Sequence, residues 1–376
     1  MTQSVTVFGA GLVGRAIVAD LCPEFSTRVA DVDETRLTAL AQQYAVETQQ
    51  ADLAKSDTIA ALSADSDLVV CAVPGFMGFA TLKAIIESGT DVVDISFFDR
   101  DPFELDGLAK ENGVTAITDC GVAPGMSNLI VGYHNATMKV ESFDCMVGGL
   151  PFDRVWPYEY KAPFSPSDVI EEYVRPARLR ENGEVVIRPA LSEAELIEIE
   201  PVGTLEAFNT DGLRTLLDTT SIPNMRERTL RYPGHIELMR VLRESGFFDT
   251  TALQIGGASI RPRDLTAALL FPLWKAGPGE EEFTVMVIEI TGLENGETVT
   301  HRYHLFDKDD PATGLSSMAR TTGFTATAAA RLVLDGSFRQ AGISPPESVG
   351  AVSGCLQKML AMLSERGVTY QHSRRA

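Results

Sequence analysis

Three glycines near the start of the chain have the spacing of a phosphate-binding loop. The segment Gly9–Gly14 reads GxGxxG, follows the apolar run Val5–Phe8 and precedes a helical pattern at Arg15–Leu21. In such a loop the glycines permit a tight turn, close approach of the backbone to a pyrophosphate, and close packing of helix on strand. A glycine turn without a ligand is the alternative, but the position between a strand and a helix favours dinucleotide binding. The predicted cofactor contacts are Gly9, Gly11, Leu12, Val13 and Gly14.

An acidic residue at the end of the second predicted strand bears on which dinucleotide binds. Asp31 lies 17 residues beyond Gly14 and is followed by Val32, Asp33 and Glu34 rather than by an arginine. A carboxylate at this position accepts hydrogen bonds from the adenosine ribose hydroxyls and repels a 2′-phosphate. The sequence therefore favours NAD over NADP, with Asp31 and Val32 at the cofactor. A turn-forming aspartate is the alternative, and Asp33 is the better candidate for the helix cap.

Two further strand ends could reach the same cofactor. Asp52 closes the segment where a third strand would end and could approach the adenine, although a lone acid is often a solvated loop residue. The segment Val73-Pro74-Gly75 ends an apolar strand at the carboxyl edge of the sheet, where a nicotinamide ribose would lie. A simple turn is the alternative for this segment. We predict cofactor contacts from Asp52, Val73 and Pro74.

Asp119 and His235 are the candidates for proton transfer. Asp119 ends a later strand at the same edge of the sheet, where a carboxylate could position an amine or activate water. An aspartate that caps the following turn is the alternative. His235 begins a helix directly after Arg231-Tyr232-Pro233-Gly234, and its ordinary pKa near neutrality suits a proton shuttle, although a lone histidine is more often structural.

Polar residues in the second half of the chain could bind a small amino-acid substrate. Arg231, together with the amides of the following helix, suits a carboxylate. Asp211 and Arg214 pair an acid with a base at a helix start, or else form a helix cap beside a surface arginine. Tyr160 and Lys161 could face the substrate, or else form a strand edge with an extended lysine. The predicted substrate contacts are Arg231, Tyr232, Arg214, Asp211, Tyr160 and Lys161.

Three further histidines, His301, His304 and His372, are given no role. His301 and His304 lie on opposite faces of a predicted strand, so they cannot share a ligand. His372 lies in the tail of the chain. We therefore predict no metal site.

The order of these elements predicts an α/β protein. Strand and helix patterns alternate at first, which is typical of a Rossmann domain, a doubly wound parallel sheet. Later strands alternate polar with apolar residues, and Asn295-Gly296 predicts an antiparallel hairpin between Phe283–Ile290 and Val299–Phe306. We expect an NAD-binding domain at 1–122, an α+β domain at 123–345, and a C-terminal helix at 346–376 that could pack back on the first domain.

Composition excludes several classes of function. The chain has 376 residues, and 52 acidic against 32 basic side chains give a formal net charge of −20. Such a charge repels nucleic acid and anionic membranes, and the longest apolar run is broken by Pro74, Gly75 and Lys83. Five scattered cysteines without a CxxC pair fit a reducing compartment, and no signal-peptide pattern opens the chain. We expect a cytoplasmic protein that binds a small molecule, with neither nucleic acid nor membrane as a partner.

Several longer strings resemble the saccharopine dehydrogenase-like family, most closely its lysine 6-dehydrogenase branch. Two segments, Trp156–Lys161 and Phe271–Gly279, match that family more loosely, so the substrate within the family stays open. The matching strings run almost from end to end of the chain: Val93–Phe98, Asp119–Asn128, Gly148–Pro151, Ile170–Tyr173, Arg175–Ala177, Asp211–Arg214, Thr229–His235 and Ser316–Thr325.

This resemblance implies a Rossmann domain followed by a domain of mixed sheet that supplies the substrate site and a dimer interface. It implies oxidative deamination of L-lysine at the ε-carbon, with hydride transfer to NAD, imine hydrolysis and cyclisation to a piperideine carboxylate. Asp119 and His235 are then the candidates for the proton work, and Arg231 or Arg214 for the α-carboxylate. The nearest alternative is a saccharopine-type or carboxynorspermidine-type reductase that joins an amine to an aldehyde, and a more distant one is a non-catalytic NAD-sensing protein. A homodimer or higher homo-oligomer is expected.

Overall fold

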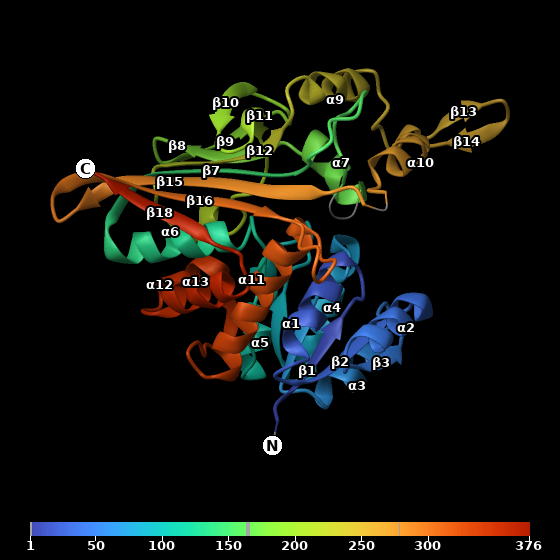
Figure 1. Ribbon diagram of the computed structural model, residues 1–376, viewed down its shortest axis with the longest axis vertical. Coiled ribbons are helices and arrows are strands. Elements are labelled where there is room, and N and C mark those ends of the chain that lie inside the picture. Colours follow the sequence, from blue (N-terminus) through green and yellow to red (C-terminus); the bar gives the residue numbers. More distant parts are fainter. Residues whose placement is uncertain (1, 163–165, 278) are drawn as a thin grey trace. The chain divides into compact units, whose positions relative to one another are not determined.

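The chain folds into two compact units. The computed structural model describes residues 2–162, 166–277 and 279–376. Unit 1 comprises Met1–Thr137 and Ala319–Thr369, and unit 2 comprises Met138–Met318 and Tyr370–Ala376. Each unit is built on one large sheet, which Figure 1 shows with its covering helices.

Unit 1 is built on a sheet of seven parallel strands. The order in which the chain adds strands to the sheet changes direction between β1 (Ser4–Phe8) and β4 (Leu68–Cys71). The loops that follow these two strands therefore meet at the switch point where open α/β sheets bind ligands. The central strands β4 and β5 are buried throughout, and β4 is apolar along its whole length, as is typical of a parallel sheet covered on both faces. This confirms the predicted Rossmann fold. In spatial order the strands are β17 (Gly342–Ser344), β6 (Thr115–Ile117), β5 (Asp91–Asp94), β4 (Leu68–Cys71), β1 (Ser4–Phe8), β2 (Ser26–Asp31) and β3 (Glu47–Gln50).

Helices of unit 1 come from both of its chain segments. The side chain of Asp33 caps α2 by accepting hydrogen bonds from the amides of Thr35 and Arg36, which confirms its predicted role. The helices are α1 (Leu12–Leu21), α2 (Glu34–Gln43), α3 (Ser56–Ala64), α4 (Gly75–Glu87), the 3-10 turn Pro102–Leu105, α5 (Asp106–Glu111), α6 (Met126–Thr137), α11 (Ser317–Leu334, in unit 1 from Ala319), α12 (Pro346–Ala351) and α13 (Cys355–Glu365).

The unit boundaries differ from the expected ones because helix α6 and the late segment 319–369 pack with the first sheet. A Cβ on Gly132 of α6 would overlap the backbone of Glu347 on α12, so only glycine allows these two helices to lie this close. On the other side of the unit, Gly323 of α11 brings its backbone close to α1, where a Cβ would lie 3.1 Å from that of Ala16. Unit 1 therefore extends to Thr137 rather than to residue 122, and resumes at Ala319 rather than at residue 346.

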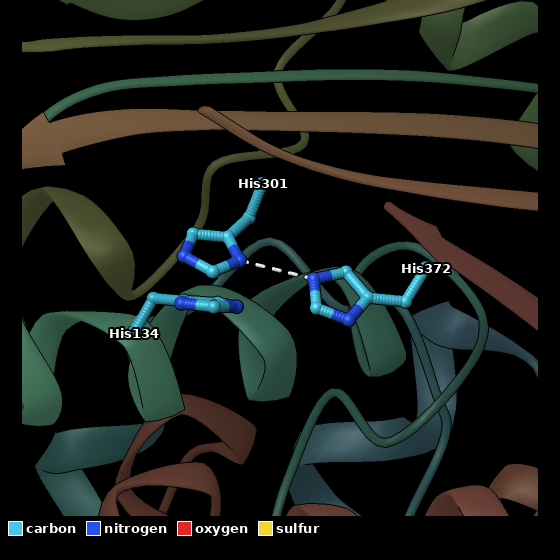
Figure 2. A group of neighbouring side chains, drawn as sticks. All are labelled: His134, His301 and His372. Carbon is cyan, nitrogen blue, oxygen red and sulfur yellow. Dashed lines mark hydrogen bonds between the residues drawn. The ribbon is translucent and has the colours of Figure 1, made fainter. Parts of the chain in front are cut away.

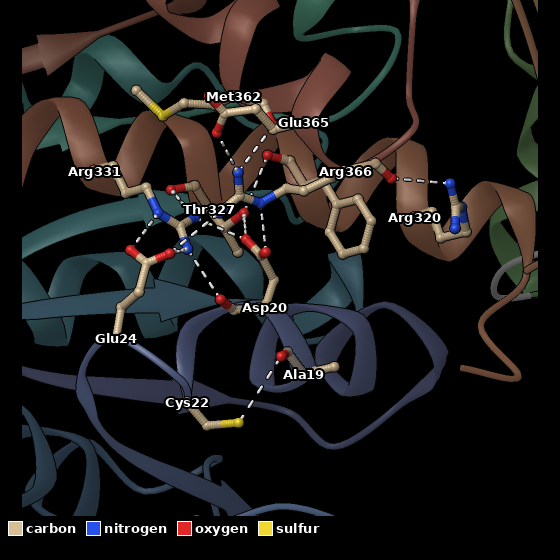
Figure 3. A network of polar contacts seen from close by, with 11 residues as sticks. Ala19, Asp20, Cys22, Glu24, Arg320, Thr327, Arg331, Met362, Glu365 and Arg366 are labelled. Carbon is tan, nitrogen blue, oxygen red and sulfur yellow. Dashed lines mark hydrogen bonds and ion pairs between the residues drawn. The ribbon is translucent and has the colours of Figure 1, made fainter. Parts of the chain in front are cut away.

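A buried ion-pair network ties α1 to the late helices. Figure 3 shows Asp20 of α1 between Arg331 of α11 and Arg366, which follows α13. Arg331 Nη1 lies 2.7 Å from Asp20 Oδ2, and its Nε lies 3.0 Å from Glu24 Oε2. The hydroxyl of Thr327 donates a further hydrogen bond to Asp20. Because the Asp20 and Arg331 side chains are about nine-tenths buried, the network fixes the C-terminal end of α1.

Unit 2 is built on a nine-stranded mixed sheet. Among its pairings, β12 runs parallel to β7 and the others are antiparallel. The strands are β7 (Lys139–Pro151), β8 (Ala177–Glu181), β9 (Glu184–Arg188), β10 (Glu195–Ile199), β11 (Gly203–Asn209), β12 (Asn224–Arg231), β15 (Glu282–Glu294), β16 (Glu297–Lys308) and β18 (Tyr370–Arg375). The expected hairpin is confirmed: Asn295 and Gly296 both have positive φ between β15 and β16.

The tail of the chain does not stay helical as expected for 346–376. After α13 the chain turns at Gly367, whose φ is +80°, and Tyr370–Arg375 then pairs antiparallel with β16 as β18. The edge of β16 offers unpaired backbone groups that an extended tail can satisfy, which helical periodicity in the preceding residues does not reveal.

Helices pack on the sheet of unit 2, and a small, largely exposed hairpin extends away from it (Figure 1). They are α7 (Pro166–Val174), α8 (Leu216–Thr219), α9 (His235–Glu244), α10 (Pro262–Trp274) and the hairpin of β13 (Leu253–Ile255) with β14 (Ala258–Ile260). The largest side chains of the core between sheet and helices are aromatic, with Tyr173, Phe208, Trp274 and Phe283 fully buried. Of the helices in the described residues, none combines the length and apolarity needed to cross a bilayer.

Candidate active site

The glycine loop of unit 1 has the shape that a pyrophosphate requires. Gly9 has φ +101°, and a Cβ there would lie 2.5 Å from the carbonyl oxygen of Ala72. A Cβ on Gly14 would overlap the carbonyl oxygen of Gly9. Gly11 differs, because no described atom lies within 4 Å of the position that its Cβ would take. The first and third glycines therefore hold the loop together, and the second leaves open space beside the backbone.

The start of α1 lies at this open space. Gly11 is the N-cap residue, and no side chain among the described residues caps this helix end. The first amides of a helix point outward and carry partial positive charge, so they suit an anion. Leu12 is 58% exposed at the same place, and Val13 is half-buried beside it. The residues present therefore fit the phosphates of a dinucleotide.

Asp31 lies at the rim of the glycine loop. It is the last residue of β2, and its Oδ2 accepts a hydrogen bond of 2.6 Å from the amide of Ala10. Its Oδ1 accepts one of 2.8 Å from the amide of Asp33. A carboxylate has about four acceptor sites, so both oxygens retain capacity for the hydroxyls of a ribose. Val32 beside it is 68% exposed.

The other predicted cofactor contacts lie at the same edge of the sheet with different surroundings. Val73 is buried, and Pro74 is the N-cap residue of α4. Asp52 follows β3 on the surface, where it accepts a hydrogen bond from the amide of Ala54 and pairs with Lys55 at 3.3 Å. These two interactions, the amide first, lower the pKa of Asp52. Asp52 thus has the surroundings of a solvated loop residue, the alternative that its sequence context offered.

Asp119 lies two residues beyond β6 at the carboxyl edge of the sheet. It is 2% exposed and has φ +52°, an uncommon backbone conformation for a residue other than glycine. A tight turn follows, in which the Gly121 amide donates to Pro124 and the Met126 amide donates to Gly121. Such backbone geometry is often found at functional sites, where the surrounding structure imposes it. The structure therefore keeps Asp119 as the candidate proton acceptor of unit 1.

The surroundings of His235 in unit 2 do not fit a proton shuttle. Nδ1 donates a hydrogen bond of 2.8 Å to the carbonyl of Tyr158, so Nε2 of the neutral ring accepts one of 2.9 Å from the hydroxyl of Tyr173. Burial and then the charge of Arg231 lower the pKa of His235 to about 3. The ring is thus neutral near pH 7 with both nitrogens in use, which is the structural role that the sequence left open.

We expect the His235 ring to remain neutral from pH 9 down to about pH 5, because protonation would bury a charge beside Arg231. NMR of the ring nitrogens should show no titration in this range, whereas the unfolded chain titrates near pH 6.5. Below pH 6.5 the unfolded ring takes up a proton and the folded ring does not. As the pH is lowered from 6.5 to 5, the free energy of unfolding should therefore decrease by about 1.4 kcal/mol for each pH unit. A titration midpoint of the His235 ring between pH 6 and 7 in the folded protein would instead support a role in proton transfer.

The guanidinium of Arg231 already has hydrogen-bond and ion-pair partners within unit 2. It is 2% exposed at the end of β12, and its Nη2 lies 2.6 Å from Glu172 Oε2. Nε donates to the hydroxyl of Tyr173 at 3.3 Å, and Nη1 donates to a backbone carbonyl at 2.9 Å. The guanidinium also lies 4.4 Å from the ring centre of Tyr160. A substrate carboxylate would have to displace these partners, so the geometry does not fit the expected α-carboxylate clamp.

The structure separates the other predicted substrate contacts. Tyr160 joins Arg231 and His235 around Trp274 in the core. Tyr232 donates to the carbonyl of Pro151 at 2.9 Å instead, and Lys161 lies 3.1 Å from Glu280. Asp211 accepts two hydrogen bonds from the guanidinium of Arg178, at 2.9 and 3.1 Å, and Arg214 is 7% exposed with φ +51°. The six residues therefore do not form one cluster.

Two groups of residues without predicted roles proved to be connected. Glu172 and Tyr173 on α7 hold Arg231 and His235, although helical spacing cannot show that α7 meets α9 across 62 positions of sequence. Figure 2 shows the rings of His301 on β16 and His372 on β18 joined by a hydrogen bond of 3.0 Å between Nδ1 and Nε2. This pair could not be predicted from the sequence, because it depends on the tail forming a strand.

Comparisons with known proteins identify related chains. The model of the saccharopine dehydrogenase NADP binding domain matches residues 5–117, and that of the saccharopine dehydrogenase C-terminal domain matches residues 121–368. A saccharopine dehydrogenase [NADP(+), L-glutamate-forming] of Saccharomyces cerevisiae is 24% identical over 93% of this chain and 94% of its own length. An alpha-aminoadipic semialdehyde synthase of Arabidopsis thaliana is 27% identical over 56% of this chain, which spans only 21% of that protein.

A solved structure shares the fold over the full length of both chains. Apo saccharopine dehydrogenase (L-Glu forming) from Saccharomyces cerevisiae superposes with a TM-score of 0.83 at 22% sequence identity. At this identity the likeness establishes the arrangement of sheets and helices, including the parallel sheet of unit 1 and the mixed sheet of unit 2.

Proposed function

Because this chain belongs to the saccharopine dehydrogenase family, as matches over residues 5–117 and 121–368 show, we propose that it is an NAD-dependent oxidoreductase that deaminates L-lysine at the ε-carbon. The family assigns unit 1 a nicotinamide-dinucleotide cofactor and an oxidoreductase activity. The choice of NAD and of lysine is the proposal. It is supported by Asp31 at the cofactor loop and by the sequence strings that resemble the lysine 6-dehydrogenase branch.

Asp31 is the single observation that carries the choice of NAD. Its carboxylate lies at the end of β2, held 2.6 Å from the Ala10 amide of the glycine loop, and a negative charge there repels a 2′-phosphate. The next residues, Val32, Asp33 and Glu34, supply no cation to bind such a phosphate. The yeast relative named above and the matching cofactor-domain model carry NADP in their names, so this chain would differ from them at this position.

The proposed chemistry assigns the chain's residues to binding and proton transfer. When bound, a nicotinamide ring supplies the acceptor for the hydride that leaves the carbon bearing the amine. The glycine loop and the start of α1 would hold the phosphates, and Asp31 the adenosine ribose. Asp119 would accept the proton that the substrate ammonium must lose before oxidation, since only the neutral amine has a lone pair to form the C=N bond. Water then hydrolyses the imine, and the aldehyde cyclises with the α-amine.

Absorbance of NADH formation tests the proposal directly. The protein is incubated at mildly alkaline pH with NAD and, separately, each of the twenty amino acids, ornithine, diaminopimelate and saccharopine. A rise with lysine alone supports the proposal, and a rise with saccharopine alone assigns the chain the activity named for its relatives. Oxidation of NADPH by an amine together with an aldehyde would indicate reductive coupling instead. Binding of NAD by calorimetry without turnover in any assay would indicate a cofactor-sensing protein.

We expect Asp31→Asn to weaken NAD binding at least tenfold and to reduce the preference for NAD over NADP. The variant loses the charge that repels a 2′-phosphate, and a hydrogen bond to a charged group contributes about 1.5–3 kcal/mol, which corresponds to about tenfold or more in affinity. Calorimetry with both cofactors measures the change. Asp33→Asn is the matched control, because Asp33 caps α2 two residues away. Tighter binding of NADP than of NAD by the unmodified protein would contradict the assignment.

A further inference from the structure

A second aspartate lies beside Asp119 in unit 1. Asp94 is the last residue of β5, between β4 and β6 in the sheet, and it pairs in register with Cys71, the last residue of β4. The amide of Cys120, which follows Asp119, donates a hydrogen bond of 3.0 Å to the Asp94 carbonyl. The carboxyl ends of parallel strands meet at one edge of a sheet, so both aspartates lie at the edge where such sheets bind ligands.

The two oxygens of the Asp94 carboxyl group have unequal surroundings. Oδ1 accepts a hydrogen bond of 2.5 Å from the Ser96 amide and another from the Ser96 hydroxyl. Oδ2 is buried as well, and it has no hydrogen-bond partner among the described residues. The side chain as a whole is 0% exposed. A buried carboxylate oxygen is rarely left without a donor, because the loss of its hydration is costly, so this oxygen calls for a proton or a ligand.

Among the described residues, none of the groups that shift the pKa of Asp94 is a cation. The titratable groups that act on Asp94 are the thiol of Cys71 and the carboxylate of Asp119, and Asp94 and Asp119 both act on the thiol of Cys120. The first turn of α4, from Gly75 to Gly78, contains no titratable side chain. Burial raises the pKa of Asp94 to about 7; its bonds to Ser96 and the nearby thiol of Cys71 oppose this shift, and the charge of Asp119 adds to it. Two neighbouring carboxyl groups in such a place cannot both be ionised without a large cost.

We propose that Asp94 is a positioning residue that acts through Asp119: its Oδ2 carries a proton beside the Asp119 carboxyl group, and loss of that proton places a negative charge next to Asp119. This inference rests on the proposed amine oxidation. In the step concerned, an N–H bond of the substrate ammonium breaks, its proton forms an O–H bond on the Asp119 carboxylate, and the amine keeps the electron pair. When Asp94 is also ionised, the negative charge beside Asp119 favours this transfer.

The pH dependence of turnover follows from the charge of the pair. Asp94 would be neutral below about pH 7 and negatively charged above it. We expect kcat with the amine substrate to rise about tenfold between pH 6 and 8, which is the ratio of the ionised fractions of a group that titrates midway between them. In Asp94→Asn this rise should disappear, whereas the affinity for NAD should change less than twofold because Asp94 lies outside the glycine loop.

Infrared spectroscopy of the carboxyl C=O band tests the proton itself and needs no substrate. The spectrum of the unmodified protein minus that of Asp94→Asn should contain a protonated carboxyl band at pH 6 that disappears with a midpoint near pH 7. Subtraction is needed because burial also raises the pKa of Glu282. The matched control is Asp91→Asn, a buried aspartate at the opposite end of the same strand that pairs with Arg339.

The infrared titration and the pH profile of turnover together test the proton on Asp94, its role in turnover and the proposed amine oxidation. A band that titrates near pH 7, together with a flat pH profile in Asp94→Asn and a normal one in Asp91→Asn, supports the proposal. A protein without a protonated carboxyl band at pH 6 overturns it, even if Asp94→Asn fails to fold, because the unmodified protein can be titrated alone. A normal pH profile in Asp94→Asn overturns the role in turnover. Absence of turnover with every amine is a failure of the proposed function, and the infrared titration then still decides whether the pair shares a proton.

Discussion

Gly14→Ala should abolish high-affinity binding of the dinucleotide and destabilise unit 1. The new Cβ would overlap the carbonyl oxygen of Gly9, and backbone on both sides leaves no flexible side chain to move away. The start of α1 must therefore shift from the position that its amides need to bind phosphate. Overpacking of this kind costs about 1–3 kcal/mol of folding free energy. Denaturant unfolding and calorimetric titration with NAD measure the two effects.

Gly11→Ala separates the two effects, because the structure leaves open space at that Cβ. We expect its free energy of unfolding to change by less than about 0.5 kcal/mol, the range of substitutions that meet nothing. Its affinity for NAD should nevertheless fall more than about tenfold, because the methyl group occupies the path by which a pyrophosphate approaches the backbone. Unchanged affinity in Gly11→Ala would mean that the phosphates do not bind at this loop.

Arg231→Met should destabilise the protein by about 3 kcal/mol. The substitution removes the partner of the Glu172 carboxylate, a donor to Tyr173, and the cation over the Tyr160 ring. Removing one member of a buried ion pair costs about 3–5 kcal/mol, and the lower end applies because the Glu172 side chain is a quarter exposed. Denaturant unfolding followed by circular dichroism measures the loss.

The matched control for Arg231→Met is Arg261→Met in the same unit. Arg261 pairs with Asp264 at 2.7 Å, but both side chains are more than half exposed. A solvent-exposed pair of this kind contributes about 0–1 kcal/mol, so the control should be nearly neutral. A loss of less than about 1 kcal/mol in Arg231→Met would show that Arg231 is not a structural cation and would return it to the list of candidate substrate contacts.

The parts of the site that the sequence predicted depend on contacts between residues close together in the chain. The glycine loop joins one strand to the next helix, and Asp31 ends the second strand of the same βαβ unit, so the spacing of residue types alone determines their geometry. The cap of α2 by Asp33 is local in the same way. Local patterns therefore predicted the fold of unit 1 and the form of its cofactor loop.

The parts that could not be predicted depend on contacts between distant segments. His235 and Arg231 are near one another in sequence, and their types suggested a substrate site. Tyr173 and Glu172 on another helix occupy both side chains, and burial removes the charge that His235 would need. Asp94 gave no signal, since an aspartate at a strand end resembles any turn residue until its neighbours are known.

Unit 1 is built from two segments that are far apart in the chain, so it cannot be completed until late in synthesis. Strand β17 completes one side of the parallel sheet beside β6, and Gly323 brings α11 onto α1, yet both arrive after the long first segment of unit 2, Met138–Met318. A ribosome adds about 5–20 residues per second, so roughly 10–40 s separate the appearance of Thr137 from that of Ser344. During this time the edge of β6 and the outer face of α1 have no native cover. An expression fragment that ends at residue 122 would keep this unfinished form permanently, whereas a fragment joining 1–137 to 319–369 would contain the complete sheet.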